Sequence, residues 1–182
     1  MLRDMGMSFR GVGCVNAVWM VSWLVSGPIW GRVVDRWGCR PVLVACAAAL
    51  GPLQAVWLWI DTPARVYAVI PIANVFAGFL TGGVGVGIST LLYKATPAAG
   101  RSVQFAVYSV LVVLLAAPFP TLGGCLPGWL ARLGLASDLR YTFYAAGLVV
   151  LASALVARRI PEEGSCRTRH MLRQLGGEWL PA

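Results

Sequence analysis

Charged residues are scarce in this sequence. Asp, Glu, Lys and Arg make up 12% of its 182 residues, whereas soluble domains carry about 25%. Hydrophobic residues account for 58% of the chain and fall in long runs. This composition excludes an ordinary soluble domain. It indicates an all-α integral membrane protein whose main partner is the lipid bilayer.

Groups that bind metals or perform catalysis are also rare. The single histidine, His170, lies in a polar C-terminal segment, and the sequence has neither an H-E-x-x-H nor a G-x-S-x-G motif. The five cysteines are scattered and form no C-x-x-C pair, which is typical of small apolar residues rather than of a disulfide framework or metal site. We therefore expect no enzyme activity, no metal and no cofactor.

Five apolar runs are present, each about as long as the 20 or so residues that a transmembrane helix needs. They cover residues 11–30, 42–60, 66–92, 103–125 and 141–157, so the predicted transmembrane domain is 1–160 and residues 161–182 form a tail. The first run is longer than the core of a signal peptide and lacks an A-x-A exit, so we expect it to be retained. Gly51-Pro52 predicts a kink in the second run.

The gap between the first two runs, GPIWGRVVDRWGCRP from Gly27 to Pro41, is rich in arginine and glycine. Residues 31–40 fit the pattern G-x-x-x-D-R-x-G-x-R. This resembles the cytoplasmic signature loop of the major facilitator superfamily of secondary transporters. A plain basic connector, common in tight inside loops, is the alternative. The predicted signature residues are Gly31, Arg32, Asp35, Arg36, Gly38 and Arg40.

The resemblance implies a fold and a set of partners. Such transporters have two six-helix halves around a midplane site, and the signature joins the second and third helices of a half. The five runs would then be helices two to six, and the missing helices of the same transporter would be partners. Asn74-x-x-x-Gly78, where the N-terminal half usually has an arginine, favours the C-terminal half. Pro120-x-x-Gly123-Gly124 points to the other half, because it resembles the end of the GPxxGG motif of proton antiporters, although Phe119 replaces the glycine before the proline. We expect the chain to be most of the C-terminal half.

The activity implied is secondary active transport of a small solute by alternating access. In that picture Asp35 faces the start of the 103–125 helix near Ser102, pairs with Arg32, Arg36 or Arg40, and acts as a cytoplasmic gate. A multi-span scaffold or partner subunit that transports nothing is the alternative function.

Polar residues inside the apolar runs are candidates for a substrate cavity, although each could instead form an interhelical hydrogen bond. They are Asn16, Gln54, Asn74, Thr81, Gln104 and Tyr108. The middle of each run lacks Asp, Glu, Lys, Arg and His, so the resemblance would place any carboxylate proton relay in the missing helices.

Glycines spaced four apart predict faces on which another helix can approach closely. The third run contains two such pairs, and the fourth run adds a double glycine. A role in holding phosphate is the less favoured alternative, because these glycines lie inside apolar runs rather than between a strand and a helix. The predicted packing glycines are Gly78, Gly82, Gly83, Gly87, Gly123 and Gly124.

Basic residues predict the orientation, because they concentrate in cytoplasmic loops. With five spans, ten basic residues lie on the same side of the membrane as the signature loop and five lie on the opposite side. The N-terminus is therefore predicted outside and the C-terminus in the cytoplasm, in a plasma (inner) membrane. The same distribution explains the net charge of +8 without a nucleic-acid partner.

Overall fold

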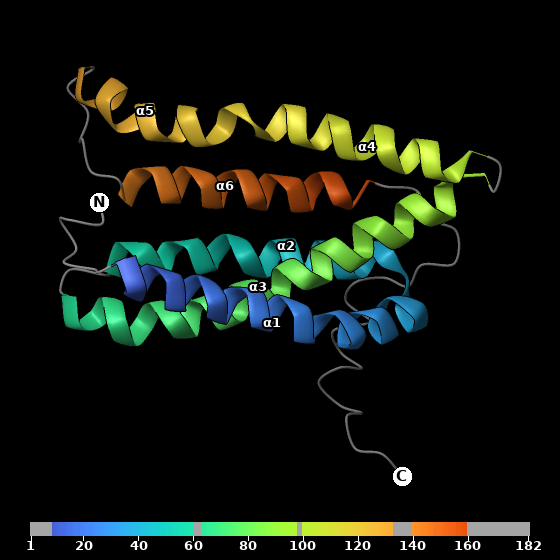
Figure 1. Cartoon of the computed structure of the whole chain (residues 1–182), viewed down its shortest axis with the longest axis horizontal. Helices are drawn as coiled ribbons and strands as arrows, with labels where there is room; N and C mark the ends of the chain where they lie inside the picture. The colour runs from blue at the N-terminus through green and yellow to red at the C-terminus, as the bar shows by residue number, and fades with distance from the viewer. Residues whose placement is uncertain (1–8, 60–62, 98–99, 133–139, 160–182) are drawn as a thin grey trace, which may run out of the picture.

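A computed structural model describes residues 9–59, 63–97, 100–132 and 140–159 (Figure 1). The regular elements in these ranges are all helical, which confirms the predicted all-α class. They are α1 (Phe9–Trp37), α2 (Cys39–Leu53), the 3₁₀ helix η1 (Gln54–Trp59), α3 (Pro63–Ala95), α4 (Arg101–Ala116), α5 (Pro118–Arg132) and α6 (Arg140–Ala157). The predicted tail, 161–182, lies outside the described residues.

Four stretches of the described chain are long and apolar enough to cross a membrane. They are Gly13–Trp37, Cys39–Val56, Ala68–Ala95 and Arg101–Cys125, and Ala145–Ala157 is a shorter apolar helix. These five segments correspond to the five apolar runs of the sequence.

The helices α1, α2, α3 and α6 lie side by side as a bundle, and α4 and α5 form a long rod next to α6 (Figure 1). α1 packs mainly on α3, and α2 packs on both α3 and α6. One end of the bundle contains the end of α1, the start of α2, the end of α3, the start of α4 and the end of α6. We call this the signature end.

The predicted signature loop is largely helical, which corrects the expectation from the sequence. α1 continues through Gly27-Pro28 to Trp37, and α2 begins at Cys39. The helix continues because a stripe of apolar side chains faces the core through its last two turns, namely Trp30, Val33, Val34 and Trp37. The turn between the helices consists of Gly38, whose φ of 93° is rarely adopted by residues with a side chain.

α2 changes its helical geometry close to Pro52, where the sequence predicts a kink. The α-helix ends at Leu53, and η1 follows directly from Gln54. A proline inside a helix removes one backbone hydrogen bond and crowds the preceding turn, and tighter 3₁₀ turns are common at helix ends. Because α2 begins at the signature end, Gln54, which follows its last residue, lies toward the opposite end of the bundle.

Glycines of α3 lie where two neighbouring helices approach closely. A Cβ on Gly83 would lie 2.8 Å from the Trp30 ring of α1 and 2.6 Å from the Cys46 sulfur of α2. A Cβ on Gly87 would lie 2.9 Å from Leu43. At Gly78 and Gly82 the added atom would overlap the backbone oxygen of Trp19 and the hydroxyl of Ser26. These contacts leave α3 no room for larger side chains at the four positions.

Two hydrogen bonds join α1 to the backbone of α3. The indole N–H of Trp30 donates to the Phe79 carbonyl at 2.7 Å, and the Ser22 hydroxyl donates to the Val75 carbonyl at 2.6 Å. Both bonds place a polar group of α1 on the glycine-bearing helix, so the α1–α3 contact has a fixed register.

The predicted span 103–125 consists of two helices, α4 and α5, separated by Ala117. Pro118 follows Ala117 and has no N–H to donate, which explains the interruption. No residue of α4 is buried. The expected close packing at Gly123 and Gly124 is not found in the described chain, because nothing lies within 4 Å of an added Cβ at either position.

Candidate functional site

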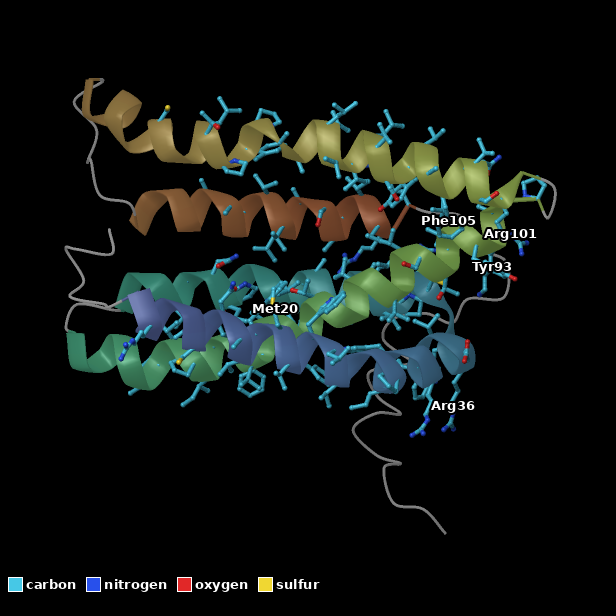
Figure 2. The ribbon with its side chains drawn as sticks, in the orientation of Figure 1. Met20, Arg36, Tyr93, Arg101 and Phe105 are labelled. Carbon is cyan, nitrogen blue, oxygen red and sulfur yellow. The ribbon has the colours of Figure 1, made fainter. Side chains whose placement is uncertain are left out.

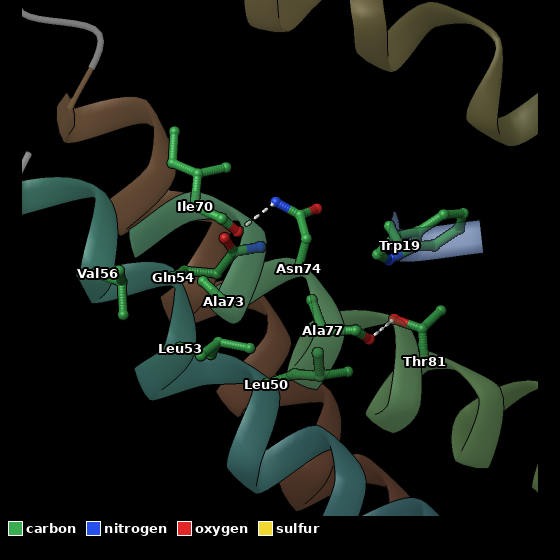
Figure 3. A pocket seen from close by; sticks show the side chains of 10 residues that line it. All are labelled: Trp19, Leu50, Leu53, Gln54, Val56, Ile70, Ala73, Asn74, Ala77 and Thr81. Atoms are coloured by element: carbon green, nitrogen blue, oxygen red, sulfur yellow. Dashed lines mark hydrogen bonds between the residues drawn. The ribbon is translucent and has the colours of Figure 1, made fainter. Parts of the chain in front are cut away.

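A cavity of about 260 Å³ lies between α1, α2, η1 and α3 (Figure 3). We call it the polar pocket. Its lining residues are Trp19, Leu50, Leu53, Gln54, Val56, Ile70, Ala73, Asn74, Ala77 and Thr81. Three of the six predicted cavity residues, Gln54, Asn74 and Thr81, are therefore brought together from sequence positions far apart.

Two of these polar side chains, Asn74 and Thr81, each donate a hydrogen bond to a backbone carbonyl of α3. The amide of Asn74 donates to the Ile70 carbonyl at 3.0 Å, and the Thr81 hydroxyl donates to the Ala77 carbonyl at 2.7 Å. An asparagine amide has two N–H donors and an acceptor oxygen, so this bond uses part of its capacity. In Figure 3 the side chains of Gln54, from η1, and Asn74, from α3, line the same pocket.

The other predicted cavity residues lie elsewhere. Asn16 is exposed on α1, while Gln104 and Tyr108 are exposed on α4. Trp19, which supplies the aromatic wall of the polar pocket, was not among the residues predicted from the sequence to line a cavity. Its place opposite Gly78 of α3 depends on the register of two helices, which a pattern in one helix does not reveal.

The signature residues divide between two surfaces. Arg32, Asp35 and Arg36 are exposed on the last two turns of α1, on the side away from its buried stripe. The Arg36 guanidinium lies 5.0 Å from the centroid of the Trp37 ring. Among the described residues, Asp35 forms no ion pair with an arginine, which differs from the pairing expected.

Arg40 points in another direction from the exposed signature residues. Its guanidinium Nη2 donates a hydrogen bond to the carbonyl of Arg158, the residue that follows α6. Carbonyl groups at a helix C-terminus have no partner within the helix and carry partial negative charge, so a cation is favourable there. Arg40 therefore fastens the start of α2 to the end of α6.

Arg101, the first residue of α4, contacts Tyr93 of α3 and Thr96 in the connection between the two helices at the same end. The Arg101 guanidinium stacks 3.8 Å from the centroid of the Tyr93 ring, and its Nη2 donates to the Thr96 carbonyl at 3.3 Å (Figure 2). α4 starts after Gly100, which has a φ of 86°. With Arg32, Arg36, Arg40, Lys94, Arg158 and Arg159, Arg101 makes the signature end strongly basic.

The helices, their apolar surfaces and the basic end define a multi-span α-helical membrane protein. The profile of the Major Facilitator Superfamily matches residues 1–170, and the chain belongs to this family. The chain is 29% identical over 135 residues to "Major facilitator superfamily domain-containing protein 10" of Homo sapiens, covering 72% of this chain and 29% of that protein.

The protein of the same name from Bos taurus is 29% identical over 133 residues, covering 71% of this chain and 28% of the relative. The chain thus spans less than a third of the length of the curated relatives it matches. No solved structure matches the chain.

Proposed function

We propose that this chain contributes to secondary transport of a small solute by alternating access, together with further helices of a facilitator. The observation that carries the proposal is that α4 is apolar but has no buried residue. Of the four described spans long enough to cross a membrane, Arg101–Cys125 is the most apolar, and none of it is buried within the bundle. A helix that is apolar all round is normally covered by lipid or by other helices.

Polar residues on α4 favour helices over lipid alone. Gln104 and Tyr108 are exposed and lie four residues apart, which places them on one face of the helix. Polar groups inside a membrane usually face a bundle interior or a water-filled cavity. This face therefore supports an additional helix layer or a cavity that the described chain does not complete, as expected of one part of a two-half transporter.

The exposed signature residues Arg32, Asp35 and Arg36 supply the gate in this proposal. They lie at the basic end and face away from the buried stripe of α1, so their charges are accessible to a neighbouring helix. An exposed ion pair contributes about 0–1 kcal/mol. Contacts of this size can form and break as a transporter changes between inward-facing and outward-facing states.

The test is a reconstitution with and without complementary helices. The chain is purified alone, or together with a co-expressed polypeptide that comprises the segment of the human relative outside the matched region. Each preparation is incorporated into liposomes loaded with a radiolabelled mixture of small metabolites. We expect solute-specific, saturable efflux from the combined preparation and none from the chain alone.

An assembled pair that gives no efflux of any component would contradict the transport proposal and favour a scaffold. Co-purification of the two polypeptides establishes assembly independently of flux. An Asp35→Asn variant then tests the gate, because it should alter the efflux rate without reducing co-purification.

A further inference from the structure

We propose that the polar pocket binds an uncharged small molecule with an apolar body and a single amide-like or hydroxyl group. This inference rests on the proposed function for the identification of that molecule as the transported solute. The binding site itself requires only α1, α2, η1 and α3. It can therefore be tested on the chain alone.

The lining of the polar pocket offers no charged partner to a charged ligand. None of its ten lining residues is Asp, Glu, Lys, Arg or His. The basic residues Arg32, Arg36 and Arg40 lie near the junction of α1 and α2 at the signature end, whereas Gln54 follows the far end of α2. A charge buried without a partner is strongly unfavourable. A neutral ligand avoids this cost.

The polar groups of the pocket can both donate and accept hydrogen bonds. Asn74 uses one N–H for the Ile70 carbonyl, which leaves a second N–H and the side-chain oxygen for a ligand. Gln54 presents another amide from the facing helix (Figure 3). Two amides that line one pocket suit a ligand group that has a donor and an acceptor at once, such as a carboxamide.

The remaining wall favours an apolar body on the ligand. Leu50, Leu53, Val56 and Ile70 offer aliphatic surface, and Trp19 adds an aromatic ring. Pockets for small molecules typically combine such a lining with a few polar groups that fix orientation. The volume of about 260 Å³ limits the ligand to a small ring or short chain.

The experiment uses three probes that share a benzene ring: neutral benzamide, anionic benzoate and cationic benzamidine. The full chain is placed in lipid nanodiscs, and binding of radiolabelled benzamide is measured by equilibrium dialysis against empty nanodiscs. We expect saturable binding that unlabelled benzamide displaces. Benzoate and benzamidine should displace it at least tenfold less effectively.

Variants with matched controls locate the site. Gln54→Leu and Asn74→Leu should each weaken benzamide binding about three- to tenfold, the change expected for one lost hydrogen bond. The controls Asn16→Leu and Ser153→Leu introduce leucine at exposed polar positions outside the pocket and should not change it. Ala77→Phe fills the pocket without removing a polar group and should abolish binding.

Circular dichroism and size-exclusion profiles establish that each variant is folded. The proposal is overturned if the chain shows no saturable binding, if a charged probe competes as well as benzamide, or if the control variants weaken binding as much as the pocket variants. Transport is measured separately, so absent flux with intact binding would contradict the proposed function and leave the binding site in place.

Discussion

The guanidinium of Arg40 donates a hydrogen bond to the carbonyl of Arg158, 118 residues further along the chain. This bond joins the first turn of α2 to the residue after α6. It gives one signature residue a structural role that differs from that of its exposed neighbours Arg32 and Asp35.

Replacing Arg40 should loosen the end of α6. Arg40→Gln removes a charged donor from a helix C-terminus, and we expect the free energy of unfolding to fall by about 1–2 kcal/mol. Hydrogen exchange in nanodiscs should become faster in the last turn of α6, near Ala154 to Ala157. Arg32→Gln, at an exposed position, serves as the control. Equal protection of α6 in the two variants would contradict this role.

The glycines of α3 should differ in their tolerance of alanine. Gly83→Ala places a methyl group within 2.6 Å of the Cys46 sulfur, and such overpacking costs about 1–3 kcal/mol. At Gly85 the nearest atom to an added Cβ is Trp23 Nε1 at 3.8 Å, an ordinary contact. Gly85→Ala should therefore be neutral or stabilise the helix by about 0.5–1 kcal/mol. Thermal unfolding in detergent measures both, and identical melting temperatures would contradict the packing described.

Asp35 should contribute little to the stability of the chain. It is exposed and pairs with no described arginine, so Asp35→Asn should change the free energy of unfolding by less than about 0.5 kcal/mol. Trp37→Ala, two residues away, removes a side chain that is 8% exposed and should cost about 3–5 kcal/mol. Denaturation of the two variants in detergent provides the comparison. A large loss for Asp35→Asn would show that this carboxylate belongs to the packed structure rather than to a gate.

A test of the predicted orientation by cysteine labelling requires engineered cysteines, because the native Cys39 at the signature end is fully buried. In a variant without its native cysteines, Ala95→Cys at the exposed end of α3 should react with a membrane-impermeant maleimide only after the cytoplasmic side is opened. Arg10→Cys, exposed near the start of α1, should react in intact cells. The opposite pattern would reverse the assigned orientation.

The helices were predictable from the sequence because long apolar runs leave few alternatives in a membrane. The turn at Gly38 was misjudged as part of a loop, since arginines and glycines around it conceal the buried stripe of Val33, Val34 and Trp37. The polar residues inside the apolar runs could be identified from the sequence, but the sequence did not indicate which of them share a pocket. Gln54 and Asn74 meet in the polar pocket while Asn16 does not, because the faces in contact depend on the packing between helices.

The single-residue turn at Gly38 couples the movement of α1 to that of α2. A connection of one residue is short, so a displacement of the end of α1 must also move the start of α2. Through the bond from Arg40, the same displacement reaches the end of α6. A force applied to the exposed charges of α1 would therefore also move the start of α2 and the end of α6.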